Sequence, residues 1–179
     1  MKFRKLPVLL FLAFSTIVFS QNKKGDWALS ASVSPYPTET GGHNDFGFLG
    51  LAGLEFFVSD KVSFSGSFFT SDNGTLKNDS DVDIKSYGFI PSTQYYFVNK
   101  ESYNLFGQIA YGFGFKSDER TPFDNEALRI YSLGAGGQYH INDVLSLQLL
   151  LPYFNAKDIT LNRDDADGVA VFLGLRFKL

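Results

Sequence analysis

The sequence predicts an all-β protein, an eight-stranded antiparallel up-and-down transmembrane β-barrel that follows a cleaved signal peptide. Three observations predict this fold class. The N-terminus is basic and then apolar, long segments alternate apolar residues with small or polar ones, and the connections between these segments alternate between long and short. The expected domains are a signal peptide at residues 1–20 and an outer-membrane β-barrel domain at residues 21–179.

The N-terminal segment has the parts of a signal peptide. Lys2, Arg4 and Lys5 supply the positive charge, and residues 6–19 form an apolar stretch. This stretch is shorter than the roughly 20 residues of a membrane-spanning helix. We therefore expect cleavage after Ser20, with an uncleaved anchor helix as the less favoured alternative. The chain has no cysteine, which excludes a lipoprotein anchor and a disulfide framework.

The composition is unusual for a secreted soluble protein. Aromatic residues make up 17% of the chain, with 20 Phe and 9 Tyr. So many rings need burial, either in a core or in lipid. The net charge is −3 and the basic residues are scattered, so nothing favours binding to nucleic acid.

The strand segments are recognised by their period of two, which places apolar side chains on one face. Their lengths favour a membrane barrel, because a tilted membrane strand needs about 9–11 residues and ordinary strands average about 5–6. Eight segments fit: 27–34, 46–58, 62–69, 84–97, 104–115, 129–141, 145–153 and 169–179. Pro91 and Pro152 lie inside two of them, where each removes a ladder donor, and we interpret them as bulges or upper strand ends.

The connections alternate in length, which predicts how the barrel is oriented. Long loops are expected outside the cell and short turns in the periplasm, with both termini periplasmic. The expected loops are 35–45, 71–83, 116–126 and 155–167, and the expected turns are 59–61, 99–101 and 142–143. Closure is expected because lipid offers no hydrogen bonds to a free strand edge.

The alternating segments and the C-terminal sequence resemble the small outer-membrane β-barrel proteins, the OmpA-like and OmpX-like barrels. In that family a final strand with a glycine, spaced apolar residues and a terminal aromatic is read by the barrel-assembly machinery. The resemblance assigns this signal to Gly174, Phe177 and Leu179, although the aromatic lies two residues before the end. It also implies a Gram-negative outer membrane, contact with its lipid and lipopolysaccharide, and a monomer.

Three charged residues are expected inside the barrel near its periplasmic end, namely Glu55, Arg176 and Lys178. Unpaired charges there are costly, so they should pair. A gate across the lumen and a structural plug both fit, and we favour the plug because eight strands leave room only for side chains. Four bulky residues should also point inward: Phe57, Phe69, Phe106 and Phe172.

An enzyme is not expected. His43 lies in the first outer loop without an evident serine partner, and His140 lies at a periplasmic end, away from the outer leaflet. The acidic runs 79–83 and 164–168 lack the complete pattern of a calcium loop, so solvated loops, or divalent bridging to lipopolysaccharide phosphates, are the interpretations. We expect no cofactor and no metal.

Aromatic residues near the strand ends are interpreted as interfacial girdles. They are Trp27, Tyr103 and Tyr139 at one end and Tyr87, Phe115, Tyr131 and Tyr153 at the other. The sequence thus predicts a structural or surface-interaction role in the outer membrane. A narrow channel for small solutes, a lipid-modifying enzyme and a soluble lipocalin-like binder are the alternatives.

Overall fold

The computed structural model describes residues 22–40, 43–73, 84–118, 126–159 and 163–179. The predicted signal peptide lies outside the described residues and stays a prediction. Within them, no helix is long and apolar enough to cross a membrane. The strands are β1 (Trp27–Thr40), β2 (His43–Ser59), β3 (Val62–Asn73), β4 (Ile84–Asn99), β5 (Tyr103–Asp118), β6 (Glu126–His140), β7 (Leu145–Asp158), β8 (Arg163–Val169) and β9 (Phe172–Lys178).

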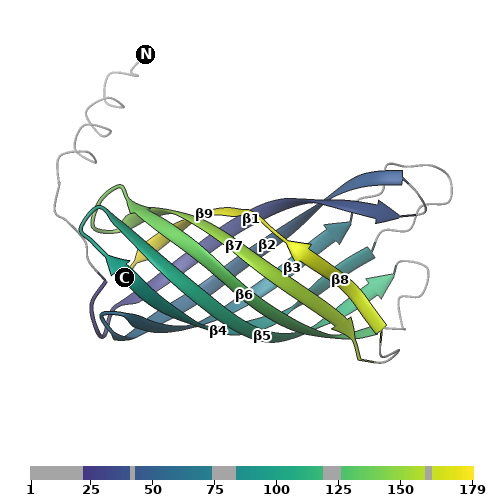
Figure 1. Ribbon diagram of the computed structural model, residues 1–179, viewed down its shortest axis with the longest axis horizontal. Coiled ribbons are helices and arrows are strands. Elements are labelled where there is room, and N and C mark those ends of the chain that lie inside the picture. Colours follow the sequence, from purple (N-terminus) through teal and green to yellow (C-terminus); the bar gives the residue numbers. More distant parts are fainter. Residues whose placement is uncertain (1–21, 41–42, 74–83, 119–125, 160–162) are drawn as a thin grey trace, which may run out of the picture.

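The strands close into one antiparallel barrel (Figure 1). From β1 to β7 each strand pairs with the next, and β9 pairs with both β7 and β1. The two short strands β8 and β9 share one register along β7, which makes them two parts of a single last strand. The eight-stranded closed barrel predicted from the sequence is therefore confirmed.

We name the two ends of the barrel by their connections. The turn end carries the turns between β2 and β3, β4 and β5, and β6 and β7, together with the C-terminus. The loop end carries the other connections. Outward side chains are exposed and inward ones are packed, as the period of two predicts.

The two prolines lie inside strands, without a shift of register beside them. Pro91 pairs with Gly66 of β3, while the β4–β5 ladder has no partner for it. Pro152 accepts a hydrogen bond from Ala170 N at 3.0 Å but has no N–H to return, and the last strand is interrupted opposite it. The prediction that they mark bulges or strand ends was wrong, because a missing donor interrupts a ladder without displacing it.

Two further prolines account for a split in the wall at the loop end. The β1–β9 ladder ends at Val33↔Leu173, and none of the described residues pairs β1 with β8. Trp27 O accepts from Leu179 N, so odd-numbered residues of β1 direct their backbone groups toward the last strand. Pro35 and Pro37 therefore lack N–H groups where a ladder to β8 would need them.

The long loops were predicted with wrong boundaries. Strand β1 continues to Thr40 and β2 already begins at His43, while β7 reaches Asp158 and β8 begins at Arg163. Likewise β3 reaches Asn73 and β5 reaches Asp118, within the other two predicted loops, whose remaining residues 74–83 and 119–125 lie outside the described residues. The backbone hydrogen bonds of a strand can continue beyond the lipid, where its outward side chains no longer need to be apolar. The alternating pattern therefore ends before the strand does.

The lumen is filled with side chains. The predicted inward rings of Phe57, Phe106 and Phe172 are buried in one cluster with Tyr96, Leu150 and Ala170. A second cluster holds Phe69, Ile130 and Ala156. The Phe69 ring occupies the space over Gly88 and Gly114, where an added Cβ would lie 2.5 and 2.6 Å from it. All seven predicted girdle aromatics are outward and exposed.

Candidate functional site

A buried carboxylate that accepts hydrogen bonds from three side chains lies in the lumen near the turn end. Glu55 of β2 is 5% exposed and faces inward. Its Oε2 accepts from Arg176 Nε at 2.9 Å. Its Oε1 accepts from Ser63 Oγ at 2.6 Å and from the Tyr96 hydroxyl at 2.7 Å. Because the donors come from β9, β3 and β4, one side chain connects four strands.

Tyr96 carries the network further across the barrel. Its hydroxyl accepts from Gln138 Nε2 of β6 at 3.1 Å. The Tyr96 ring lies between the rings of Phe57 and Phe106, with both centroid distances 5.2 Å. We call Glu55, Ser63, Tyr96, Gln138 and Arg176 the interior plug.

Arg176 is the cation of the plug and is only 1% exposed. Besides its bond to Glu55, its guanidinium carbon lies 5.3 Å from the centre of the Phe57 ring, a cation–π contact. Its neighbours on the two adjacent strands are Ser30 and Ser146, whose side chains are small and polar. Its Nη2 atom has no hydrogen-bond partner among the described residues.

Lys178, predicted as part of the same cluster, lies outside the plug. Its Nζ atom is 2.6 Å from Asp26 Oδ2, and both side chains are about one-fifth exposed, at 21% and 20%. The expected charge cluster is therefore divided into a buried pair, Glu55–Arg176, and a pair at the rim. Sequence reasoning missed Asp26 because it precedes the first alternating segment. Its place just before β1, the strand beside β9, is the signal that could have identified it.

The predicted C-terminal signal residues differ in their surroundings. Gly174 faces inward, where a Cβ would lie 2.3 Å from Ala31 O, so a side chain cannot fit there. Phe177 and Leu179 face outward, 41% and 69% exposed. Recognition of these three residues by an assembly machinery stays a prediction.

The structure places His140 against a serine, a contact that the sequence analysis missed. His140 Nδ1 lies 2.7 Å from Ser146 Oγ, inside the turn end, and both side chains are buried. His140 and Ser146 are paired across β6 and β7. The short turn predicted at 142–143 could have indicated this pairing in the sequence. Ser146 is also the neighbour of Arg176, which makes the pair an extension of the plug.

Most of the candidate residues in the predicted loops lie outside the described part of the structure. The backbone of His43 begins β2 opposite Thr40, but its side chain lies outside the described residues. The same holds for the run 79–83 and for the side chains of residues 164–166. Asp167 is exposed and accepts from the Tyr153 hydroxyl at 3.2 Å. The described residues contain no group of three His, Cys, Asp or Glu side chains placed to hold a metal.

Comparisons with known proteins agree with this geometry. Residues 6–177 match the family model described as "outer membrane protein beta-barrel domain". No curated protein matches the sequence. Among solved structures, the chain resembles Ail, the attachment invasion locus protein of Yersinia pestis, with 18% identity, a TM-score of 0.56, and coverage of 87% of this chain and 99% of that chain.

Two other solved structures share the fold. Neisserial surface protein A has a TM-score of 0.65 at 12% identity and covers 87% of this chain and 97% of its own. The N-terminal β-barrel domain of Pseudomonas aeruginosa OprF has a TM-score of 0.58 at 11% identity, with 88% and 100% covered. At such identities the likeness concerns the fold alone.

Proposed function

This chain belongs to the outer membrane protein β-barrel domain family, and we propose that it serves there as a monomeric structural or surface-interaction protein without enzymatic activity. Its place is the outer membrane. In this proposal the lumen is closed by the interior plug, and the loop end makes the contacts outside the cell, with lipopolysaccharide among its partners. The barrel-assembly machinery inserts the chain through its last strand.

The proposed orientation has the turn end and both termini in the periplasm. It is supported by the short connections at the turn end, such as Asp60–Lys61 between β2 and β3, and by the strands that extend past the outward aromatic band at the loop end. Bacterial outer-membrane barrels combine short periplasmic turns with longer extracellular connections.

One observation carries the proposal of a closed lumen, the hydrogen bonds of Glu55 to donors from three other strands. Side chains of β2, β3, β4, β6 and β9 thereby meet in the middle of a barrel that is only eight strands wide. The aromatic cluster around Phe57 and Phe106 packs against them. An interior of this size is filled by side chains rather than by a continuous water column.

Planar-bilayer recording tests this proposal. We expect the wild-type protein to give no stable openings, because an ion would have to break the buried pair. Glu55→Ala/Arg176→Ala is the positive control, since removing both long side chains opens space in the middle of the lumen. Stable, uniform openings of the wild-type protein would contradict the plug.

A narrow channel is the second candidate, and one observation favours it. Ser30, Ser146 and the unpartnered Nη2 atom of Arg176 place polar groups along one wall of the lumen beside the plug, although Ser146 and Nη2 are buried. A channel would pass ions along this wall, and the same recordings distinguish it from the closed barrel. Ser146→Val should then lower the conductance of a channel and leave a closed barrel silent.

A further inference from the structure

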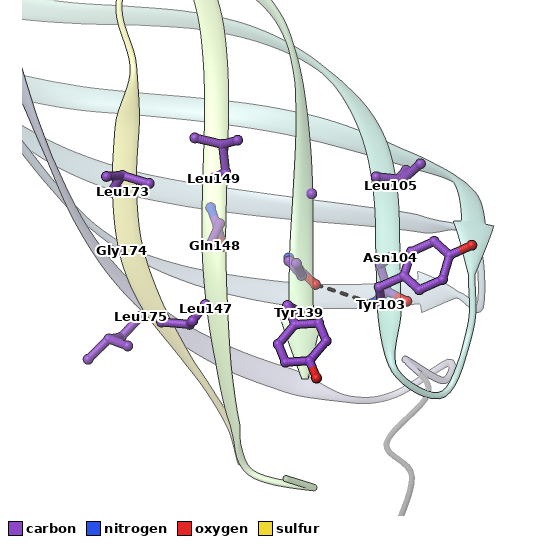
Figure 2. A pocket seen from close by; sticks show the side chains of 12 residues that line it. Tyr103, Asn104, Leu105, Tyr139, Leu147, Gln148, Leu149, Leu173, Gly174 and Leu175 are labelled. Atoms are coloured by element: carbon purple, nitrogen blue, oxygen red, sulfur yellow. Dashed lines mark hydrogen bonds between the residues drawn. The ribbon is translucent and has the colours of Figure 1, made fainter. Parts of the chain in front are cut away.

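A hollow lies in the outer surface of the barrel near the turn end. It has a volume of about 570 Å³ and crosses β5, β6, β7 and β9. Figure 2 shows Leu105, Leu149 and Leu173 on the side of the hollow away from the turns, and Tyr139 and Leu147 nearer to them. The outward residues around it are apolar or aromatic, and they belong to the band of exposed apolar side chains that surrounds the barrel.

The strand register explains why the surface is hollow here. Two outward rows run across the four strands. The row nearer the turns is Tyr103, Tyr139, Leu147 and Leu175, and the next row is Leu105, Gly137, Leu149 and Leu173. Every position in these rows carries a large side chain except Gly137, and that gap forms the floor of the hollow.

The protein leaves this gap unfilled, although it covers another outward glycine. At Gly66 an added Cβ would lie 2.6 Å from Phe89 Cζ, so the neighbouring ring already covers that position. At Gly137 the nearest atoms are Leu105 Cδ2 at 3.2 Å and Asn104 O at 3.5 Å. The space over Gly137 is thus open to whatever surrounds the barrel.

We propose that the hollow over Gly137 binds one acyl chain of a glycerophospholipid from the periplasmic leaflet. This inference rests on the proposed orientation, which puts the turn end in the periplasm. The hollow is continuous with the lipid-facing band, and its walls are aliphatic, so hydrocarbon is the matching ligand. Tyr103 and Tyr139 lie in the row nearer the turns, where phenolic hydroxyls meet the headgroup region.

A peptide or a second copy of the chain fits the hollow less well. Stable protein interfaces bury about 800 Å² per partner around well-packed anchors, whereas this hollow is confined to parts of four strands around one missing side chain. A peptide would also need free backbone hydrogen-bonding groups, and β6, which carries Gly137, is already paired with β5 on one edge and β7 on the other. A flexible chain without polar groups has neither requirement.

Native mass spectrometry of the full chain in detergent, with added palmitoyl-oleoyl phosphatidylethanolamine, tests the proposal. Gly137→Phe fills the hollow, because only the movable end of Leu105 lies close to the new side chain. Gly107→Phe is the matched control, an outward glycine that does not line the hollow and whose Cβ would meet only Gly134 O at 3.9 Å. Wild type and control should retain one lipid, and Gly137→Phe should bind it about tenfold more weakly, a difference of about 1.4 kcal/mol.

Equal lipid retention in all three proteins would overturn the proposal, and so would a dimer that disappears in Gly137→Phe. Folding is checked separately by the migration of unboiled protein on an SDS gel. If wild type lacks that shift, the membrane barrel itself fails, whereas a normal shift with equal retention contradicts only the lipid site. Should Gly137→Phe not fold, Gly137→Ala fills part of the hollow and should weaken binding to a smaller extent.

Discussion

Arg176 and Glu55 are 121 residues apart in the chain, and their side chains meet at 2.9 Å in the middle of the lumen. Arg176 lies on β9, which pairs with β1, and β1 pairs in turn with β2, which carries Glu55. The ion pair therefore reaches across one strand and ties the last strand to the first hairpin. Closure of the barrel brings the two charges together, and their contact stabilises the closed state.

Breaking this pair should destabilise the barrel strongly. Arg176→Met leaves Glu55 buried without its counter-ion, and we expect a loss of about 3–5 kcal/mol in the free energy of unfolding. The double variant Glu55→Met/Arg176→Met should lose less than the single variant, because no charge stays buried. Urea unfolding in lipid vesicles measures both. Lys178→Met is the control, since its rim pair with Asp26 is worth about 0–1 kcal/mol. A double variant that loses as much stability as Arg176→Met, or more, would contradict the buried pair.

The Tyr96 hydroxyl should matter more than any other phenol on β4. Tyr96→Phe keeps the ring between Phe57 and Phe106 but removes a donor to Glu55 and an acceptor for Gln138. The expected loss is about 1–3 kcal/mol in the free energy of unfolding, the range for leaving buried partners unsatisfied. The neighbouring Tyr95 is outward and 53% exposed, so Tyr95→Phe should change little. Equal effects of the two substitutions would contradict the plug.

A charge on the outward face distinguishes lipid from water around the barrel. Leu133 is in the middle of β6 and 65% exposed. In a bilayer, Leu133→Arg should cost about 2–4 kcal/mol, while Tyr139→Arg near the strand end should cost about 0–1 kcal/mol. Unfolding in vesicles measures this dependence on depth. A barrel surrounded by water would tolerate Leu133→Arg as well as Tyr139→Arg.

The orientation can be tested with single cysteines, because the chain has none of its own. Asp167→Cys places an exposed thiol on β8 at the loop end, and Lys61→Cys places one in the turn between β2 and β3. A maleimide that cannot cross membranes should label residue 167 in intact cells and residue 61 only after permeabilisation. Both variants use exposed positions, so labelling reports access rather than folding. The reverse pattern would place the turn end outside the cell.

Much of the fold could be predicted from the sequence because a barrel in lipid has a strict inside and outside. The period of two assigns Phe57 and Phe106 to the lumen and Trp27 to the surface, and all three are so placed. The same rule holds in the run 95–97, but three aromatic residues in a row make the alternation harder to recognise there. Tyr96 was missed for that reason, although its distance of two residues from inward Gln94 places it in the lumen.

What could not be predicted depends on contacts between distant strands. The alternation within β2 predicts that Glu55 points inward. That it pairs with Arg176 and not with Lys178 depends on the register of β1 with β2 and with β9, where the barrel closes. The strand ends at the loop end were missed because the polar residues in these parts of β1 and β8 have no apolar face and resemble loops in sequence. The hollow over Gly137 depends on its two neighbouring strands, β5 and β7, which place Leu105 and Leu149 beside the glycine and no aromatic ring over it.

The central claim is that these strands close into a stable barrel in lipid, and heat-modifiability of the membrane-extracted protein tests it most directly. Unboiled and boiled samples are compared on an SDS gel, with protease added to a parallel unboiled sample. We predict that the unboiled band migrates faster and that its strands resist the protease, because a closed ladder has no free edge to unravel. A protein that is soluble without detergent and migrates identically in both lanes would contradict the claim.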